Sequence, residues 1–373
     1  MTGSATPDLE PRALPIIGVV GAGAMGAGIA QVALEAGSEV VLHDIDPAAI
    51  ERARADIQRG LERRAAQLDL DPDTIDAWAA GRLERLRDAR TLDAVAAEAE
   101  LIVEAVLEDL GLKQEIFRAL DAAARSDTIL ATNTSALSIE AIAAATAQPA
   151  RVLGLHFFNP VPRMPLVEVV PGEVTSREVV ARAEDIVKTL GKTPVRCTDS
   201  PGFIVNRVNR PFTIEALRLL ESGAASVEGI DAAMREAGFP LGPFELMDLT
   251  GIDVTLAAAR GVWEGLGRPD HLRPSEIQER LAAAEHLGRK SGVGFYVYTD
   301  GRRDSVAPEF RVSEPPGTAL PAAEITSRIF RAIDAEAERT LADGVATESD
   351  IDLALRLGAA HPMGPFERMS TSG

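Results

Sequence analysis

Residues 16–46, IIGVVGAGAMGAGIAQVALEAGSEVVLHDID, combine an apolar strand, a glycine turn, a helix of small residues and a second strand that ends in an acid. Gly21, Gly23 and Gly26 match the pattern G-x-G-x-x-G. In this pattern the glycines allow a tight turn, the approach of a pyrophosphate to the helix N-terminus, and close packing of the helix on the sheet. The stretch therefore predicts a dinucleotide-binding turn. Its predicted cofactor-binding residues are Gly21, Gly23, Ala24, Met25 and Gly26.

The acid at the end of the second strand indicates which dinucleotide binds. Asp44 lies 23 positions after Gly21, a spacing that suits a carboxylate accepting a hydrogen bond from the adenosine ribose 2′-hydroxyl. Asp46 adds a second acid, and the local sequence Asp44-Ile45-Asp46 contains no arginine for a 2′-phosphate. We therefore expect NAD rather than NADP, with Asp44 among the cofactor-binding residues.

Short apolar strands alternate with helices up to about residue 200. The predicted strands after the opening unit are 101–106, 128–133, 151–157, 166–170 and 193–199. This alternation is typical of an α/β protein with a doubly wound, mostly parallel sheet. We expect a Rossmann-type NAD-binding domain over residues 16–200, preceded by a loose leader at 1–15.

The pattern changes to helical spacing beyond residue 200. Residues 201–298 are predicted to form an all-α domain, and residues 299–320, rich in Pro, Gly and charge, are predicted to be a linker. A truncated helical repeat should then occupy residues 321–373, because several residues recur at an offset of 121, rising to 122. The recurring pairs are Glu215 and Glu336, Gly223 and Gly344, Asp231 and Asp352, and the Gly-Pro-Phe-Glu runs at 242–245 and 364–367.

Composition excludes several functional classes. A net charge of −19 argues against nucleic acid as a partner, since phosphate binding requires a basic face. The single cysteine, Cys197, excludes an intramolecular disulfide and a cysteine-based metal cluster, and its strand context favours a buried packing role. No metal site is predicted. The chain shows no signal peptide and no apolar run long enough to span a membrane, so we expect a cytoplasmic protein.

Among five histidines, His156 has the context of a catalytic group. It ends a predicted strand at the carboxyl edge of a parallel sheet, where open α/β folds place their ligands. Glu168 lies twelve residues later in an otherwise apolar strand, where a carboxylate requires a partner. A neutral imidazole can take the proton of an alcohol while hydride leaves to NAD, and a carboxylate behind it fixes the tautomer. On spacing alone, a functional pair and a structural pair both remain open. His43, His271, His286 and His361 are expected to have surface or packing roles, the last three without nearby partners.

Two further groups of polar residues have both a structural and a functional reading. Asn133, Ser135 and Asn206 could hold a substrate oxygen, or could serve as turn and cap residues. Arg59, Arg63 and Arg64, near the end of a helix predicted for 47–69, could form a solvated face or a cationic patch for a substrate phosphate.

Six motifs give the chain a family resemblance: GAGAMGAGIA, VEAVLEDLGLKQEIF, ATNTSALSI, GLHFFNPVPRMPLVEVVPG, GKTPVRCTDSPGFIVNRV and GPFELMDLTGID. Together they resemble the L-3-hydroxyacyl-CoA dehydrogenases, including the 3-hydroxybutyryl-CoA dehydrogenases, over roughly residues 14–298. The tail resembles a partial second copy of the family's C-terminal domain. The resemblance implies reversible NAD-dependent oxidation of an (S)-3-hydroxyacyl-CoA of short or medium chain, as in fatty acid β-oxidation.

The resemblance also implies roles for individual residues. His156 becomes the catalytic base and Glu168 the residue that orients it, while Ser135 and Asn206 contact the substrate oxygen. The further residues implied at the cofactor are Glu108, Lys113, Asn133 and Asn159. The second copy has Ser327 where the first has Asn206, so it lacks that catalytic group and is expected to be structural.

Two alternatives and one question of assembly stay open at this point. A specialised relative could oxidise a hydroxyacyl group, such as a glyceryl thioester, on an acyl carrier protein for polyketide extender-unit supply. A non-catalytic structural protein on the same fold is the alternative from another class. The helical copies could form either a pseudo-dimer within one chain or a true homodimer between chains.

Overall fold

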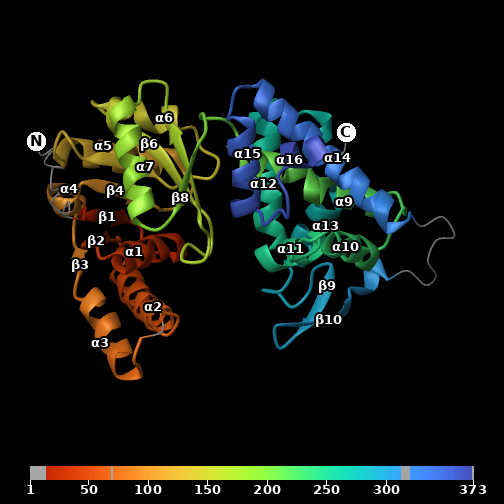
Figure 1. The fold of residues 1–373 in the computed structure, drawn as a ribbon, viewed down its shortest axis with the longest axis horizontal. Helices are drawn as coiled ribbons and strands as arrows, with labels where there is room; N and C mark the ends of the chain where they lie inside the picture. Colours follow the sequence, from red (N-terminus) through yellow and green to blue (C-terminus); the bar gives the residue numbers. More distant parts are fainter. Residues whose placement is uncertain (1–13, 69, 312–319, 372–373) are drawn as a thin grey trace, which may run out of the picture. The chain divides into compact units, whose positions relative to one another are not determined.

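Residues 14–68, 70–311 and 320–371 are described by the computed structural model shown in Figure 1. They divide into two units. The first comprises the residues up to Asn133, together with Ile139–Val167 and Gly172–Pro194. The second comprises Thr134–Ser138, Glu168–Pro171 and the chain from Val195 onward. Most of the expected leader and the residues 312–319 of the expected linker lie outside the described residues.

An eight-stranded sheet has the strand order β3-β2-β1-β4-β5-β6-β7-β8. The bounds are β1 Ile17–Val20, β2 Val40–His43, β3 Leu86–Ala89, β4 Leu101–Glu104, β5 Ile129–Thr132, β6 Val152–Phe157, β7 Leu166–Pro171 and β8 Thr193–Arg196. β1 pairs in parallel with both β2 and β4, so the strand order reverses beside β1. The predicted doubly wound sheet is confirmed, and the reversal marks the edge at which such sheets bind nucleotides.

The described helices of the first unit are α1 Ala24–Ala36, α2 Pro47–Ala65, α3 Pro72–Leu83, α4 Leu92–Glu98, α5 Leu110–Ala123, α6 Ile139–Ala143 and α7 Arg177–Thr189. Side chains cap four of them, namely α2, α4, α5 and α7. Asp46 accepts a hydrogen bond from the Ala48 amide at the start of α2, where Pro47 needs no partner for its nitrogen. β3 and α4 were not predicted from the sequence. β3 has the sequence LRDA with two exposed charged residues in its centre, a pattern that lacks the apolar run of the other strands.

The second unit is mainly helical. Its first copy of the repeat contains α8 Val205–Val208, α9 Arg210–Glu221, α10 Val227–Glu236, α11 Pro243–Thr250, α12 Ile252–Gly265 and α13 Glu276–Ala283. Its second copy contains α14 Ala322–Ala342, α15 Glu348–Gly358 and α16 Pro365–Thr371. Cys197 is buried at 2% exposure, as predicted, and burial raises the pKa of its thiol.

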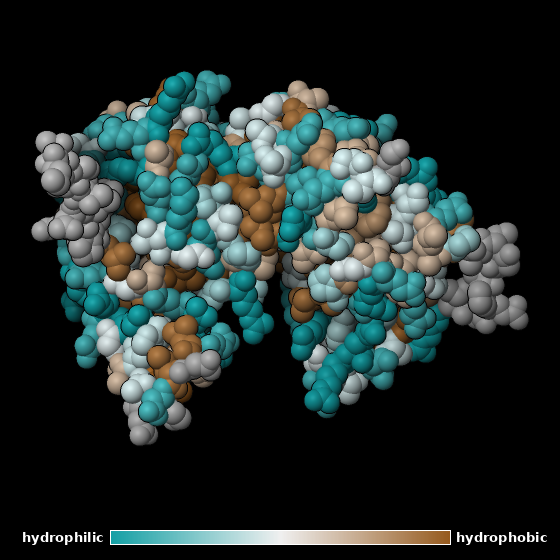
Figure 2. Space-filling view, viewed as in Figure 1, coloured by the Kyte–Doolittle hydropathy of each residue, from teal (hydrophilic) through white to brown (hydrophobic). Residues whose placement is uncertain are grey.

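The expected linker begins with a folded hairpin, which corrects the prediction for residues 299–311. β9 Tyr296–Thr299 pairs in antiparallel fashion with β10 Arg302–Val306, and a short 3₁₀ turn follows at Pro308–Phe310. The Phe310 ring packs on the Phe295 ring with centroids 5.1 Å apart, so this segment shares in the core. The charges that suggested a linker lie on the solvent side of the hairpin, where Figure 2 shows a hydrophilic surface.

The second copy repeats the first at the level of single hydrogen bonds. Asp231 accepts from the backbone amides of Phe244 and Glu245 at 2.9 and 3.2 Å. Asp352 accepts from the equivalent amides, those of Phe366 and Glu367, at 2.8 and 3.0 Å. The predicted repeat is confirmed, since a buried carboxylate binds the N-terminus of the next helix in both copies.

The two copies pack on each other with reciprocal contacts. Arg207 of the first copy pairs with Glu336 of the second at 2.8 Å, and Arg328 of the second pairs with Glu215 of the first at 2.7 Å. Both members of one pair are related to the members of the other by the same offset of 121 residues. Exchange of partners in this way is the signature of a two-fold interface. The copies are therefore related by a pseudo-two-fold axis within one chain.

A contact between equivalent residues marks that axis. Phe239 and His361, which occupy the same position in the runs GFPLGPFE and AHPMGPFE, meet with ring centroids 4.9 Å apart. Within the described residues, no helix combines the length and the hydropathy needed to cross a membrane.

Candidate functional site

The glycine turn between β1 and α1 has the geometry that its sequence predicts. Gly21 adopts a φ of +103°, and a Cβ at this position would come within 2.6 Å of the Ala105 carbonyl oxygen. A Cβ on Gly26 would overlap the Gly21 carbonyl oxygen. Gly23, by contrast, is exposed and has no atom within 4 Å of the Cβ position. The turn therefore leaves space only on the side from which a ligand would approach.

The N-terminus of α1 is prepared for an anion. Gly23 is its N-cap residue and provides no side-chain cap, and the first turn contains no acidic residue. Backbone amides at such a helix end attract the negative charge of a pyrophosphate. Asp44 lies beside the turn, where its carboxylate accepts from the amides of Ala22 at 2.7 Å and Asp46 at 2.9 Å. These residues fit NAD, with the turn for its phosphates and Asp44 for the adenosine ribose.

A buried ion pair stands at the end of β4. The Lys113 ammonium donates to Glu104 at 2.7 Å, and Glu108 lies 3.4 Å from it. Thr132 donates its hydroxyl to the other Glu104 oxygen at 2.7 Å. Lys113 and Glu108 thus lie in contact, and their role at the cofactor stays a prediction. Glu104 was not predicted as a site residue, although a carboxylate in the apolar strand LIVE is the same signal that singled out Glu168.

Asn133 joins the ends of two neighbouring strands. Its main-chain amide donates to the main-chain carbonyl oxygen of Glu104 at 2.8 Å, and its side-chain oxygen accepts from the Phe157 amide at 2.8 Å. Phe157 follows His156, so Asn133 fixes the end of β6 on which the histidine lies. His156 is 6% exposed, and its ring lies 4.5 Å from that of Phe158. Asn159 lies in the exposed loop that follows.

Glu168 belongs to the second unit, with Ser135 and Asn206. It is fully buried, and one carboxylate oxygen accepts from the amides of Ile204 at 3.0 Å and Val205 at 2.9 Å. These amides open the short helix α8, which carries Asn206. Glu168 therefore holds the start of this helix, a contact that sequence reasoning did not foresee. His156 lies in the first unit, and its pairing with Glu168 stays a prediction.

Ser135 lies in a short loop that the preceding threonine orders. The Thr134 hydroxyl accepts from the Leu137 amide at 2.9 Å, and Thr134 is buried. Ser138 donates its hydroxyl to Asp199 at 2.8 Å at the other end of the loop. Ser135 itself is half-buried between these anchors.

A cationic groove lies on the first unit beside α1, α2 and α7. It has a volume of about 800 Å³. Its basic lining residues are Arg63, Arg64, Arg82, Arg163 and Lys192. Lys192 donates to the carbonyls of Val161 and Met164 at 2.6 and 2.8 Å rather than to a carboxylate, and burial lowers the pKa of its ammonium group. The groove thus supports the hypothesis of a cationic patch for Arg63 and Arg64, two of the three arginines of the predicted helix.

Arg59 is absent from the groove lining and pairs with Asp56 on its own helix. Arg82, another cation of the groove, stacks on Trp78. Its guanidinium carbon lies 3.8 Å from the centroid of the ring. Such stacking leaves the guanidinium edge available for hydrogen bonds.

Two histidines have partners, which corrects the expectation that they stand alone. His271 Nε2 lies 2.8 Å from Glu336, and His361 Nε2 lies 2.8 Å from the Asn209 side-chain oxygen. Both partners lie across the interface between the two helical copies, and such distant contacts leave no signal in the local sequence. His43 Nδ1 lies 2.9 Å from the Ala89 carbonyl, in keeping with a structural role.

Comparison with known families gives two matches that together span most of the chain. The family described as "3-hydroxyacyl-CoA dehydrogenase, NAD binding domain" matches residues 16–200. The family described as "3-hydroxyacyl-CoA dehydrogenase, C-terminal domain" matches residues 202–298 and again residues 325–373.

Individual relatives agree with these matches. A hydroxyacyl-coenzyme A dehydrogenase of rat mitochondria is 45% identical over 283 residues, which cover 75% of this chain and 90% of the relative. A 3-hydroxyadipyl-CoA dehydrogenase of Escherichia coli is 45% identical over 281 residues, or 75% of this chain and 58% of the relative. The crystal structure of an Escherichia coli 3-hydroxybutyryl-CoA dehydrogenase superposes with a TM-score of 0.86 at 35% identity, covering 96% of this chain and 92% of that one.

Proposed function

Because this chain belongs to the NAD-dependent 3-hydroxyacyl-CoA dehydrogenase family, we propose that it oxidises short-chain (S)-3-hydroxyacyl-CoA, such as 3-hydroxybutyryl-CoA, with His156 as the base. The product is the 3-oxoacyl-CoA, and the reaction is reversible. Ser135 and Asn206 hold the reacting oxygen, and Glu168 orients the histidine. The pathway in which the chain works and its cytoplasmic location remain predictions.

The observation that carries the proposal is the environment of Glu168. Its carboxylate is buried and binds two backbone amides at the start of α8. Asn206, on this helix, and Ser135 belong to the same unit, and both side chains are able to donate hydrogen bonds to a substrate oxygen. A buried carboxylate next to a histidine would also stabilise the imidazolium that forms during the reaction.

The chemistry divides simply among these groups. When bound, NAD would supply the acceptor for the hydride that leaves C3 of the substrate. His156 takes the hydroxyl proton as the C3–O bond becomes a carbonyl, so one proton and one hydride leave together. Ser135 and Asn206 keep the oxygen in place in both directions of the reaction, and Lys113 with Glu108 shapes the wall of the cofactor site.

Coenzyme A is the carrier that the surface charges favour. The groove that contains Arg63, Arg64 and Lys192 offers cations to the phosphates of coenzyme A. An acyl carrier protein would present an acidic surface to a chain whose own net charge is −19, so the two would repel at long range. The carrier-protein thioester is therefore the second candidate substrate.

The proposal is tested by an NAD-linked absorbance assay with 3-hydroxyacyl-CoA thioesters of increasing chain length and with a glyceryl thioester on an acyl carrier protein. We expect kcat/KM to be highest for a short acyl-CoA, and a His156→Ala variant to lose about 10²–10⁴-fold in kcat. Undiminished turnover in that variant would remove His156 as the base. A higher kcat/KM for the carrier-bound substrate would favour the second candidate, and absence of all turnover would favour a structural protein.

The helical copies also suggest the state of assembly. We propose that the second copy serves as an internal dimer partner, because it already engages the first through reciprocal ion pairs. The second copy then covers the surface of the first copy that a partner chain would cover in a homodimer.

A further inference from the structure

The helix α8, which carries Asn206, is too short to hold its own conformation. It spans four residues, Val205–Val208, whereas an isolated helix of fewer than about 12 residues is marginal in water. Its orientation must therefore come from tertiary contacts. Glu168 provides one of these by binding the amides of Ile204 and Val205 at its start.

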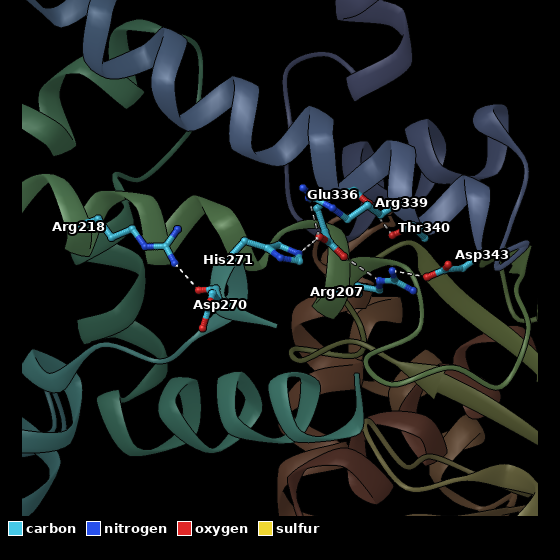
Figure 3. Close-up of polar contacts among 8 residues, drawn as sticks. All are labelled: Arg207, Arg218, Asp270, His271, Glu336, Arg339, Thr340 and Asp343. Atoms are coloured by element: carbon cyan, nitrogen blue, oxygen red, sulfur yellow. Dashed lines mark hydrogen bonds and ion pairs between the residues drawn. The ribbon is translucent and has the colours of Figure 1, made fainter. Parts of the chain in front are cut away.

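The second contact comes from the truncated copy of the repeat. Arg207, the residue after Asn206, is 3% exposed and donates its Nε to Glu336 on α14 at 2.8 Å. Its Nη2 donates to Asp343 at 2.6 Å. Figure 3 shows the Arg207 guanidinium between these two carboxylates. The Arg207 side chain on α8 is thus held by two residues that lie 129 and 136 positions further along the chain.

Glu336 is itself held in one position. It is fully buried, and its second carboxylate oxygen lies 2.8 Å from His271 Nε2 and 3.3 Å from Arg339 Nη1. The turn that carries His271 is in turn anchored by Arg218, which donates to the Asp270 carbonyl at 2.9 Å. Figure 3 shows the contact of His271 with Glu336 and that of Arg218 with the neighbouring Asp270. A carboxylate held on both oxygens can set the direction of the guanidinium that it accepts from.

We propose that Glu336 is a positioning residue for the dehydrogenase reaction, acting through Arg207 to fix the rotation of α8 and so the direction of Asn206. The truncated second copy then contributes to catalysis, although Ser327 replaces the equivalent asparagine in that copy. This inference rests on the proposed function, in which Asn206 contacts the substrate oxygen. A displacement of such a group by about 1 Å can cost about 10²-fold in rate.

The pseudo-two-fold axis supplies a matched control. Arg328 and Glu215 make the equivalent ion pair at 2.7 Å across the same interface. Arg328 follows Ser327, which has no predicted part in the reaction. Glu215 also lies 3.7 Å from Arg218, which anchors the turn of His271, so the control breaks the pair at Arg328 and leaves the contacts of Arg218 and Glu336 in place. If Glu336 mattered only for holding the copies together, the two pairs would have similar effects on the rate of the folded protein.

The test compares Glu336→Gln with Arg328→Gln in the full chain, at matched folded fraction measured by circular dichroism. We expect kcat to fall about tenfold to a hundredfold in Glu336→Gln, with KM for NAD unchanged, and to stay within about twofold of wild type in Arg328→Gln. Should Glu336→Gln fail to fold, Glu336→Asp keeps the charge, shortens the reach to Arg207, and should lower kcat in the same way. Equal rates in wild type and the folded Glu336 variant would overturn the proposal.

A double-mutant cycle separates this inference from the proposed function. If Glu336 acts through Asn206, Glu336→Gln should cost nothing further in kcat once Asn206→Ala is present. Multiplying effects of the two changes would overturn the positioning role while leaving Asn206 as a substrate contact. Full activity in Asn206→Ala alone would instead remove Asn206 from the proposed mechanism.

Discussion

His361, at the pseudo-two-fold axis, should make the stability of the protein depend on pH. Its Nε2 faces the Asn209 side-chain oxygen at 2.8 Å, whereas its Nδ1 is buried and has no hydrogen-bond partner among the described residues. Protonation would add a second N–H to the ring, at Nδ1, and this N–H would be buried without an acceptor. Burial, followed by the repulsion of Arg368, lowers the pKa of His361 from 6.5 to about 3.

The sign and size of the effect follow from this pKa. Below pH 6.5 the unfolded chain takes up a proton at this position that the folded protein refuses, so stability is lost as the pH falls. Each pH unit in this range is worth about 1.4 kcal/mol, and the difference between pH 7 and pH 5 is about 2 kcal/mol. Above pH 7 the group contributes no further pH dependence.

The assay is urea unfolding of wild type and His361→Gln at pH 7, 6 and 5, followed by circular dichroism. Glutamine can still donate to Asn209 but does not titrate, so the variant should lose about 2 kcal/mol less than wild type between pH 7 and pH 5. Parallel curves for wild type and His361→Gln would refute the reasoning.

Three further predictions concern the NAD-binding unit and the assembly. Arg63→Glu combined with Arg64→Glu should raise KM for acyl-CoA about tenfold or more by reversing the groove charge, and should leave KM for a pantetheine thioester unchanged. The control Arg59→Glu, outside the groove, should change neither value, and equal KM values in all three proteins would contradict the phosphate role. Gly26→Ala should weaken NAD binding in a fluorescence titration, because the new Cβ would overlap the Gly21 carbonyl oxygen; unchanged affinity would show that the turn can relax. Light scattering should give a mass near 39.5 kDa, and twice that mass would argue against the internal dimer.

The NAD-binding half of the protein was readable from its sequence for a physical reason. Strands buried on both faces read as apolar runs, and the glycine turn depends on contacts within a few residues, such as that between Gly26 and Gly21. Asp44 could be found from spacing because a single βαβ unit brings it to the turn. The edge strand β3 escaped notice because half of it faces solvent and carries charge.

Two simple sequence patterns predicted further features: a carboxylate within an apolar strand, and a constant offset between repeated residues. A carboxylate within an apolar strand singled out Glu168, and the same test would have found Glu104 beside Lys113. The offset between repeated residues predicted a second helical copy, and the matching hydrogen bonds of Asp231 and Asp352 confirm it.

The sequence by itself determined the sheet, the glycine turn, the NAD preference and the existence of the repeat, because each depends on short-range pattern or on spacing within one motif. Only the tertiary structure revealed that Arg207 meets Glu336, and that arginines from α2 gather with Lys192 in one groove. Charged side chains on separate helices look alike in a sequence whether they face water or each other. Their partners are decided by how the helices pack, and packing is a property of the whole fold.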